Sequence, residues 1–259
     1  MKKGMSVIVK NNNIPKGNSE QQIKPYKKSF EYSYTLGAFP TYELILNRPD
    51  IVRKVLVHTG YTDYENLSNI CNKNNIILEF NNKTIAKISD KENCYVAGVF
   101  NKYEEELNED KPHIVLVNPS NMGNLGTILR TALGFGIKDI AIIEPCADVF
   151  NPKTVRSSMG AIFKLSHHIY KSFDDYRAKY PSHDIFTFML NGSKTLNIND
   201  CPEVEKFALV FGNEASGLDD SFLDIGTSIF IPQSPEVDSL NLTIAVGIGT
   251  YMFTNKRKM

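Results

Sequence analysis

The side chains best suited to chemistry lie in three short segments in the second half of this 259-residue chain. The first segment holds Asn124 and, six residues later, Arg130. The second holds Glu214, which follows an apolar run and stands between two glycines, and the third holds Ser239 and Asn241. Carboxylate, amide, hydroxyl and guanidinium groups together can bind a polar substrate and stabilise developing charge. The three segments are therefore candidates for one catalytic site.

Each of these residues also has an ordinary structural explanation. Arg130 fits a solvent-facing position on a helix, and Glu214 fits a turn or a helix cap. Ser239 is well placed to cap a helix over residues 240–253. Asn241 is harder to explain in this way, because asparagine prefers caps and turns to the interior of a helix. Taken one at a time, the residues leave both interpretations open.

The glycines of the first segment, Gly123 and Gly126, allow a tight turn or a close approach to a ligand. Their spacing matches neither the dinucleotide motif G-x-G-x-x-G nor a phosphate-binding P-loop. A nicotinamide-dependent dehydrogenase is therefore disfavoured. The four cysteines lie far apart and no histidine stands at metal-ligand spacing, so we expect no metal site.

Short apolar runs in the second half predict the elements that position these segments. The runs cover residues 114–117, 140–143, 185–190, 207–211 and 228–231. They are almost continuously apolar, as strands covered on both faces are. We therefore expect an α/β fold with a parallel sheet and helices on both sides, whose ligands bind beyond the carboxyl ends of the strands.

The first half of the chain predicts a smaller α/β domain over residues 31–103. Helical patterns at 41–46 and 66–74 alternate with strand patterns at 54–58, 76–80 and 95–100. An acidic run over residues 104–112 is typical of an exposed linker. The larger domain then covers residues 113–259. Residues 1–30, with seven lysines and one glutamate, predict a flexible basic arm that is either a solvated tail or a contact for RNA phosphates.

The bulk composition narrows the class of protein. Hydrophobic residues make up 42% and charged residues 22% of the chain, which is ordinary for a globular protein. The formal net charge is zero, so a nucleic acid would have to be bound by a local basic patch. No segment resembles a signal peptide or is long enough to span a bilayer, and we expect a cytoplasmic protein with no membrane contact.

Together and in this order, the three segments resemble the motifs of the SpoU, or TrmH-like, family of RNA ribose methyltransferases in the SPOUT superfamily. The family motifs run Asn-x-Gly-x-x-x-Arg, Gly-x-Glu-x-x-Gly, and Ile-Pro followed by Ser-Leu-Asn. The matching residues are Asn124, Gly126, Arg130, Gly212, Glu214, Gly217, Ile231, Pro232, Ser239, Leu240 and Asn241. Residues 153–163 resemble a further family segment, and residues 36–100 resemble more loosely a substrate-binding domain akin to ribosomal protein L30.

This resemblance implies a trefoil knot in the C-terminal domain and a pocket for S-adenosylmethionine. The family binds this cofactor largely through backbone groups, which correspond here to Gly212, Ile231 and Leu240. The resemblance also implies a homodimer with RNA held across both subunits. An apolar helix after Asn241 is consistent with burial in a core or an interface.

The implied reaction moves the methyl group to a ribose 2′-hydroxyl without a metal. The family places Arg130 in the catalytic centre. Because a guanidinium resists deprotonation, we expect Arg130 to bind an RNA phosphate and to stabilise the developing alkoxide. Asn124, Glu214, Ser239 and Asn241 would orient Arg130, the ribose and the cofactor.

The RNA substrate is less closely specified by the sequence. A separate N-terminal domain favours 23S ribosomal RNA, in either a housekeeping or an antibiotic-resistance role, and transfer RNA is the alternative. An RNA-binding protein that has lost catalysis is a third interpretation, which the presence of Arg130, Glu214 and Asn241 disfavours.

Overall fold

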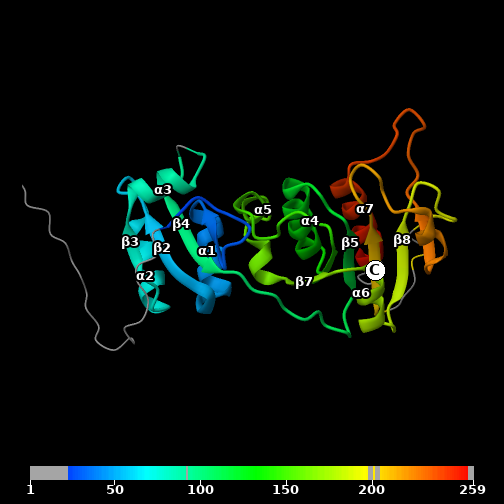
Figure 1. The fold of residues 1–259 in the computed structure, drawn as a ribbon, viewed down its shortest axis with the longest axis horizontal. Coiled ribbons are helices and arrows are strands. Elements are labelled where there is room, and N and C mark those ends of the chain that lie inside the picture. The colour runs from blue at the N-terminus through cyan, green and yellow to red at the C-terminus, as the bar shows by residue number, and fades with distance from the viewer. Residues whose placement is uncertain (1–22, 92, 198–200, 202–204, 256–259) are drawn as a thin grey trace, which may run out of the picture.

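The computed structural model of the protein describes residues 23–91, 93–197, 201 and 205–255. Within these ranges the chain forms two β-sheets with their helices, a small sheet at one end of an elongated molecule and a larger one at the other (Figure 1). In the described part of the chain, every helix is too short or too polar to cross a membrane.

The small sheet has four strands among the described residues, in the order β1-β4-β2-β3. Its strands are β1 (Tyr32–Leu36), β2 (Val52–Val57), β3 (Leu78–Phe80) and β4 (Val96–Asn101), and its helices are α1 (Ala38–Asn47), the short 3-10 helix η1 (Pro49–Ile51), α2 (Tyr64–Lys73) and α3 (Asn82–Ile88). Only β2 and β3 run parallel. The sequence predicted five of these elements and missed β1, η1 and α3.

The larger sheet is parallel throughout the described residues, with the order β7-β6-β5-β10-β8-β11-β9. Its strands are β5 (His113–Val117), β6 (Asp139–Ile143), β7 (Ser166–Tyr170), β8 (Asp184–Phe188), β9 (Lys194–Thr195), β10 (Phe207–Phe211) and β11 (Thr227–Phe230). The predicted parallel sheet is confirmed. The sequence missed β7 and β9, because β7 carries two histidines and β9 has only two residues.

Helices cover both faces of the larger sheet. They are α4 (Met122–Gly134), α5 (Pro152–Ser157), α6 (Phe173–Lys179) and α7 (Leu242–Asn255), with the 3-10 helices η2 (Ala161–Lys164) and η4 (Asp220–Asp224). Ile114 and Leu116 of β5 belong to the core beneath α4, α5 and α7, whereas Val115 and Val117 belong to the core beneath α6 and η4. This alternation follows from the pleat of the strand, which points successive side chains to opposite faces.

The two sheets are joined by a continuous apolar core. Leu44 of α1 and Phe100 of β4 belong to the same core as α4 and α7. The ring of Phe100 lies 5.2 Å from that of Phe163 in η2, and Arg48 donates from Nε to the Phe163 carbonyl oxygen at 3.2 Å. The small sheet is thus packed against the larger domain and holds a fixed position relative to it.

The acidic segment before β5 is not an exposed linker along its whole length, which corrects the expectation from its charge. Leu107 is buried, and the backbone nitrogen of Asn108 donates to Asp139 at 2.7 Å. Glu105 forms an ion pair with Arg48 and accepts a hydrogen bond from Ser166 at 3.1 Å. Partners from both domains bind the segment, because its charges alternate with groups that can be buried.

The predicted basic arm also needs correction over its second part. Residues 1–22 lie outside the described residues. Ile23 and Tyr26 pack against the core between β1, β2, β4 and α3, and the Tyr26 hydroxyl donates to Asp148 at 2.5 Å. Residues 23–30 are therefore docked on the two domains, because their apolar and aromatic side chains can be buried while their lysines stay in solvent.

Candidate active site

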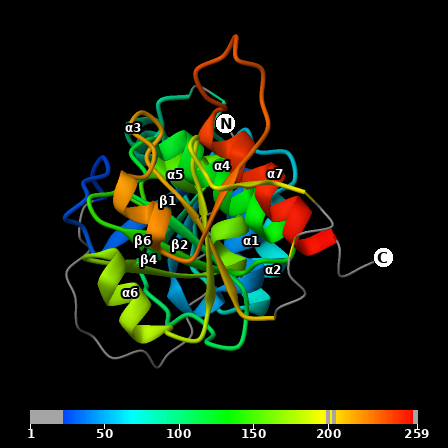
Figure 2. The ribbon, with the colours of Figure 1, turned by 90° about the vertical axis from the view of Figure 1, so that its right-hand side faces the viewer.

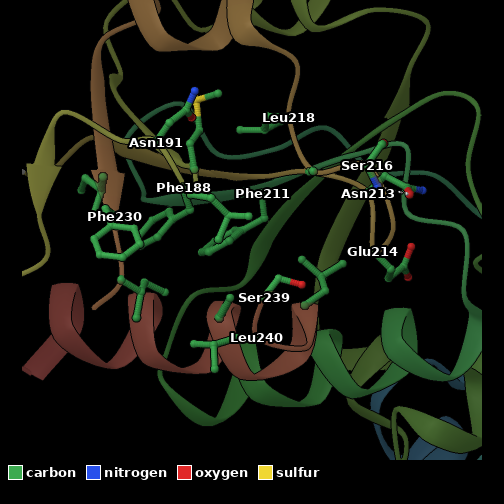
Figure 3. A pocket seen from close by; sticks show the side chains of 18 of the residues that line it. Phe188, Asn191, Phe211, Asn213, Glu214, Ser216, Leu218, Phe230, Ser239 and Leu240 are labelled. Carbon is green, nitrogen blue, oxygen red and sulfur yellow. Dashed lines mark hydrogen bonds between the residues drawn. The ribbon is translucent and has the colours of Figure 1, made fainter. Parts of the chain in front are cut away.

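A pocket of about 350 Å³ lies at the carboxyl ends of β8, β10 and β11 (Figure 3). Its walls come from the turn after β8, the loop after β10 and the segment that leads from β11 to α7. Five of the predicted site residues line it, namely Gly212, Glu214, Ile231, Ser239 and Leu240. The pocket lies beyond the strand ends, where the sequence predicts ligand binding, and its size suits a small-molecule ligand.

Two stacked phenylalanine rings form the base of this pocket. Phe188 at the end of β8 and Phe211 at the end of β10 have ring centroids 4.3 Å apart and are nearly parallel, with an interplanar angle of 16°. Helix α7 packs beneath them at Gly249, where an added Cβ would lie 2.7 Å from the Phe188 ring. A side chain at Gly249 would push these rings, so the glycine is needed for this contact.

The loop after β10 has a fixed shape. Backbone hydrogen bonds join Asn213 and Gly217 in both directions, at 2.9 and 3.2 Å. A Cβ at Gly212 would lie 2.1 Å from the backbone carbon of Gly217, so only glycine fits at Gly212. The Asn213 side chain donates to the Asn118 carbonyl oxygen at 2.7 Å and accepts from the backbone nitrogen of Ala215 at 2.8 Å.

Glu214 joins this loop to the first motif segment. One carboxylate oxygen accepts from the backbone nitrogen of Ser120 at 2.9 Å and from its hydroxyl at 2.8 Å. The other accepts from the backbone nitrogen of Asn121 at 3.0 Å and from the Asn124 side chain at 3.3 Å. Burial alone would raise the pKa of Glu214, but these donors outweigh it and lower the pKa. The carboxylate therefore stays ionised and links the two segments.

Asn121 and Gly126 explain the local structure of the first segment. Asn121 caps α4 by accepting from the backbone nitrogens of Gly123 and Asn124. A Cβ at Gly126 would lie 2.4 Å from the Thr154 carbonyl oxygen of α5. Gly126 therefore allows α4 to pack closely on α5, whereas the sequence left open a tight turn or a close approach to a ligand. Helix α5 belongs to the further family-like segment noted in the sequence.

Arg130 is not brought into the pocket of its own chain. Its side chain is exposed on α4, and among the described residues it has no hydrogen-bond or ion-pair partner. Asn124 likewise does not line the pocket, although Glu214 binds it. A single chain thus brings together the second and third segments and anchors the start of the first, while leaving Arg130 outside.

The third segment begins its helix later than predicted. Helix α7 starts at Leu242, and the Asn241 side chain accepts from the backbone nitrogen of Thr243 at 2.8 Å and from its hydroxyl at 2.7 Å. Asn241 is therefore the helix cap, and the prediction that Ser239 caps the helix is wrong. Asparagine is a strong N-cap residue, which also explains why it seemed unsuited to a helix interior. Figure 2 shows residues 231–240 as an orange loop that projects from the domain before α7.

Sequence reasoning missed the turn after β8 and one polar residue of the third segment. Asn191 and Gln233 both line the pocket and add amide groups to it. An Asn-Gly pair directly after a predicted buried strand was a detectable turn signal. A Cβ at Gly192 would lie 2.4 Å from the backbone of Ile229, so this turn must pass very close to β11.

The lining of the pocket limits what it can bind. Among its described lining residues there is no lysine, arginine or histidine, and Glu214 is the single charged residue. Elsewhere in the described residues, no group of three or more His, Cys, Asp or Glu is placed to hold a metal ion. Apolar walls with scattered amide, hydroxyl and backbone groups suit an uncharged or cationic organic ligand better than a phosphate.

Comparison with known families identifies this arrangement. The sequence profile of the SpoU rRNA Methylase family matches residues 111–251, which contain all three motif segments. The chain belongs to this family. The match begins just before β5 and so covers the larger sheet, the pocket and most of α7, but not the small sheet.

Relatives of this SpoU-family chain include named RNA methyltransferases. An uncharacterised tRNA/rRNA methyltransferase from Synechocystis is 33% identical over 139 residues, which are 53% of this chain and 51% of the relative. The 23S rRNA (guanosine(2553)-2′-O)-methyltransferase RlmP of Bacillus subtilis is 27% identical over 157 residues, which are 60% of this chain and 63% of RlmP. The chain thus spans less than two thirds of the length of these relatives.

Solved structures share the whole fold. The AdoMet-bound rRNA methyltransferase from Sinorhizobium meliloti covers 87% of this chain and 87% of its own, with a TM-score of 0.73 and 24% identity. The SpoU methyltransferase AviRb from Streptomyces viridochromogenes covers 88% of this chain and 90% of its own, with a TM-score of 0.75 and 20% identity. Because this coverage exceeds the larger domain, the small sheet takes part in the likeness.

Proposed function

We propose that the protein transfers a methyl group from S-adenosylmethionine to a ribose 2′-hydroxyl of RNA, with 23S ribosomal RNA as its substrate. The observation that carries the proposal is the convergence of the second and third family motifs on one pocket, with Glu214 binding the first motif to it. The similarity to RlmP, a 2′-O-methyltransferase of 23S rRNA, supports the ribose and the ribosomal substrate.

The pocket residues fit S-adenosylmethionine. Bound there, this cofactor would supply an electrophilic methyl group on a sulfonium. The stacked Phe188 and Phe211 and the apolar walls suit its adenine ring, and the lack of lining cations suits a ligand that has no phosphate. Backbone groups at Gly212, Ile231 and Leu240 would hold it, since these residues line the pocket.

In this proposal the polar residues of the motifs position the reaction without taking part in covalent chemistry. Glu214 fixes the start of α4, which carries Asn124, and Asn241 fixes the start of α7. Ser239 lines the pocket and is exposed, so its hydroxyl would be available to the ribose or the cofactor. Holding the acceptor oxygen in line with the methyl group accounts for much of the rate of such a transfer.

Arg130 would bind an RNA phosphate and stabilise the developing alkoxide, and a second copy of the chain would bring it to the pocket. Its exposure, and its position outside the lining of its own pocket, support action across a homodimer. Helix α7, which packs beside α4, exposes Ile244 and Tyr251 at 53% and 45%. Covering such side chains with a partner's equivalent face would remove apolar surface from water. Light scattering on the purified protein should give the mass of a dimer.

Transfer RNA is the second candidate substrate. A solved structure concerned with the 2-OH methylation of C/U34 on tRNA is similar to this chain, with a TM-score of 0.53 and 25% identity. The match covers 58% of this chain and 99% of that one. The match to that protein is limited to 58% of this chain, which is about the share of the larger domain, whereas the match to the rRNA methyltransferase from Sinorhizobium meliloti covers 87% of it. The presence of the small sheet here supports a ribosomal substrate.

The test is to incubate the protein with S-adenosylmethionine labelled in its methyl group and with ribosomal or transfer RNA. A ribose 2′-O-methyl group blocks alkaline cleavage, so labelled alkali-resistant dinucleotides should appear from 23S RNA and identify the nucleotide. Label in transfer RNA alone would favour the second candidate. Label on a base would refute the ribose assignment, and RNA binding without transfer would favour a non-catalytic protein.

A further inference from the structure

Residues 23–30 are held against the small sheet and the loop after β6 by specific contacts. The Tyr26 hydroxyl donates to Asp148 at 2.5 Å, and the Lys24 carbonyl oxygen accepts from the Tyr34 hydroxyl at 2.5 Å. Lys102 donates to the Lys28 carbonyl oxygen at 2.7 Å, and its ammonium lies 4.9 Å from the centre of the Tyr26 ring. In Figure 1 this blue segment runs between the small sheet and α5.

The docked segment presents lysines to solvent. Lys24, Lys27 and Lys28 are exposed, and among the described residues none of their ammonium groups forms an ion pair. Burial lowers the pKa of Lys102, whereas Asp148 and Glu31 act to raise it and Lys28 acts to lower it. Lys28 also acts to lower the pKa of Cys146, although burial of that thiol raises it overall.

The loop that receives this segment is bonded in turn to the first motif. The backbone nitrogen of Ala147 donates to the Pro119 carbonyl oxygen at 2.6 Å, and the Asn118 side chain donates to the Glu144 carbonyl oxygen at 2.6 Å. Ser120, the next residue of the motif loop, is bound by Glu214 of the pocket. A short chain of contacts therefore leads from the docked lysines to the candidate active site.

A fourth exposed lysine continues the same path. Lys153 at the start of α5 lies beside the beginning of α4, where a Cβ at Gly123 would be 4.0 Å from the Lys153 Cε. The acidic groups near the path are Glu31, Glu144 and Asp148. Asp148 is already bound by Tyr26, and it also acts on Lys102. The four lysines keep their charges free for an external anion.

We propose that Lys24, Lys27, Lys28 and Lys153 form a basic strip that binds the phosphates of RNA flanking the methylated nucleotide. The inference rests on the proposed function for its choice of RNA as the anion. Phosphate contacts by lysine position a nucleic acid without reading its sequence, so the strip orients RNA toward the pocket while other surfaces select the site. Because the net charge of the chain is zero, such a local strip is needed for electrostatic attraction.

The test compares two charge-matched triple variants of the full chain. The strip variant carries Lys24→Gln, Lys27→Gln and Lys28→Gln. The control variant carries Lys111→Gln, Lys138→Gln and Arg177→Gln, which are exposed just before β5, at the amino end of β6 and on α6. The dissociation constant for transcribed 23S RNA is measured from about 50 to about 200 mM salt, a range over which phosphate contacts weaken strongly.

We expect the strip variant to bind RNA about tenfold more weakly at low salt and to show a salt slope lower by about two, since three phosphate contacts are lost. The control should keep the wild-type slope, and both variants should keep the wild-type affinity for S-adenosylmethionine and the wild-type melting curve. A strip variant that binds RNA as the control does would overturn the proposal. The binding measurement does not require methyl transfer. If the proposed reaction is wrong, no label will appear on ribose, but the strip variant will still bind RNA more weakly than the control.

Discussion

Glu214 accepts two hydrogen bonds from Ser120, one from the backbone nitrogen at 2.9 Å and one from the hydroxyl at 2.8 Å. The residues are 94 positions apart in the sequence, and each lies in a loop that follows a central strand of the larger sheet. Strands β5 and β10 are neighbours and parallel, so their carboxyl ends meet at the same edge. The carboxylate thus connects the loop beside the pocket with the helix that carries Arg130.

Replacing Glu214 with glutamine should slow methyl transfer and lower the free energy of unfolding by about 1–2 kcal/mol, since hydrogen bonds to a charged acceptor are lost at a half-exposed site. Ser120→Ala removes the hydroxyl donor alone and should cost about 0.5–1 kcal/mol. Urea unfolding and initial rates with labelled cofactor would measure both. Wild-type rates in Glu214→Gln would show that this connection is not needed.

Arg130→Ala should reduce turnover by about a hundredfold or more, because stabilisation of transition-state charge is lost. Since Arg130 does not line the pocket of its own chain, titration calorimetry should show unchanged binding of S-adenosylmethionine. Arg130→Lys keeps the charge but loses the planar pair of donors, so an intermediate rate is expected. A fully active alanine variant would contradict the assignment.

Gly126→Ala should destabilise the protein by about 1–3 kcal/mol, because the new methyl group would press on the backbone of α5. Gly134→Ala, in the same helix, is the matched control. No atom lies within 4 Å of a Cβ at that position, and alanine is the better helix former by about 1 kcal/mol. Opposite signs of the two effects in urea unfolding are expected, and equal effects would refute the packing role of Gly126.

Asn241→Ala should lower the free energy of unfolding by about 1 kcal/mol, because α7 loses its cap, and Asn241→Ser should recover most of that loss. We expect turnover to follow stability in both variants, since the Asn241 side chain is bound to Thr243. A serine variant that is stable but inactive would instead indicate that the amide contacts RNA or cofactor. Thermal melting and initial rates distinguish the two cases.

His167 should make stability depend on pH. Its ring is buried between Tyr103 and Phe150, neither ring nitrogen has a hydrogen-bond partner among the described residues, and burial lowers its pKa to about 4. An unfolded histidine binds a proton below a pH of about 6.5, so between the two values the unfolded state binds more protons. Stability is therefore lost as the pH falls through this window, by on the order of 3 kcal/mol from this group.

The variant His167→Phe keeps an aromatic ring between Tyr103 and Phe150 and cannot titrate. Urea unfolding at about pH 5 and at about pH 7.5 should therefore show a smaller difference in the variant than in wild type. A pH dependence as steep as that of wild type would mean that other groups, such as the buried His113, account for it.

The chain's own pattern was sufficient to predict the parallel sheet and the place of the site. Near-continuous apolar runs such as 207–211 mark strands buried on both faces, and residues directly after such strands must meet at one edge. Elements with weaker patterns were missed. Strand β7, at the sheet edge, begins with a serine and two histidines, and β1 precedes the first apolar helix with mostly tyrosine, serine and threonine.

Tertiary structure alone decided which partners these residues have. The sequence contains Glu214 and Ser120, but a hydrogen bond between positions this far apart depends on strand order, which local pattern does not encode. The same holds for residues 23–30. Their lysines predicted a free arm, but the segment docks on the folded chain through Asp148 and through a core formed by β1, β2, β4 and α3. The placement of Arg130 outside its own pocket is likewise a property of the folded chain, because it follows from the direction in which α4 leaves the sheet.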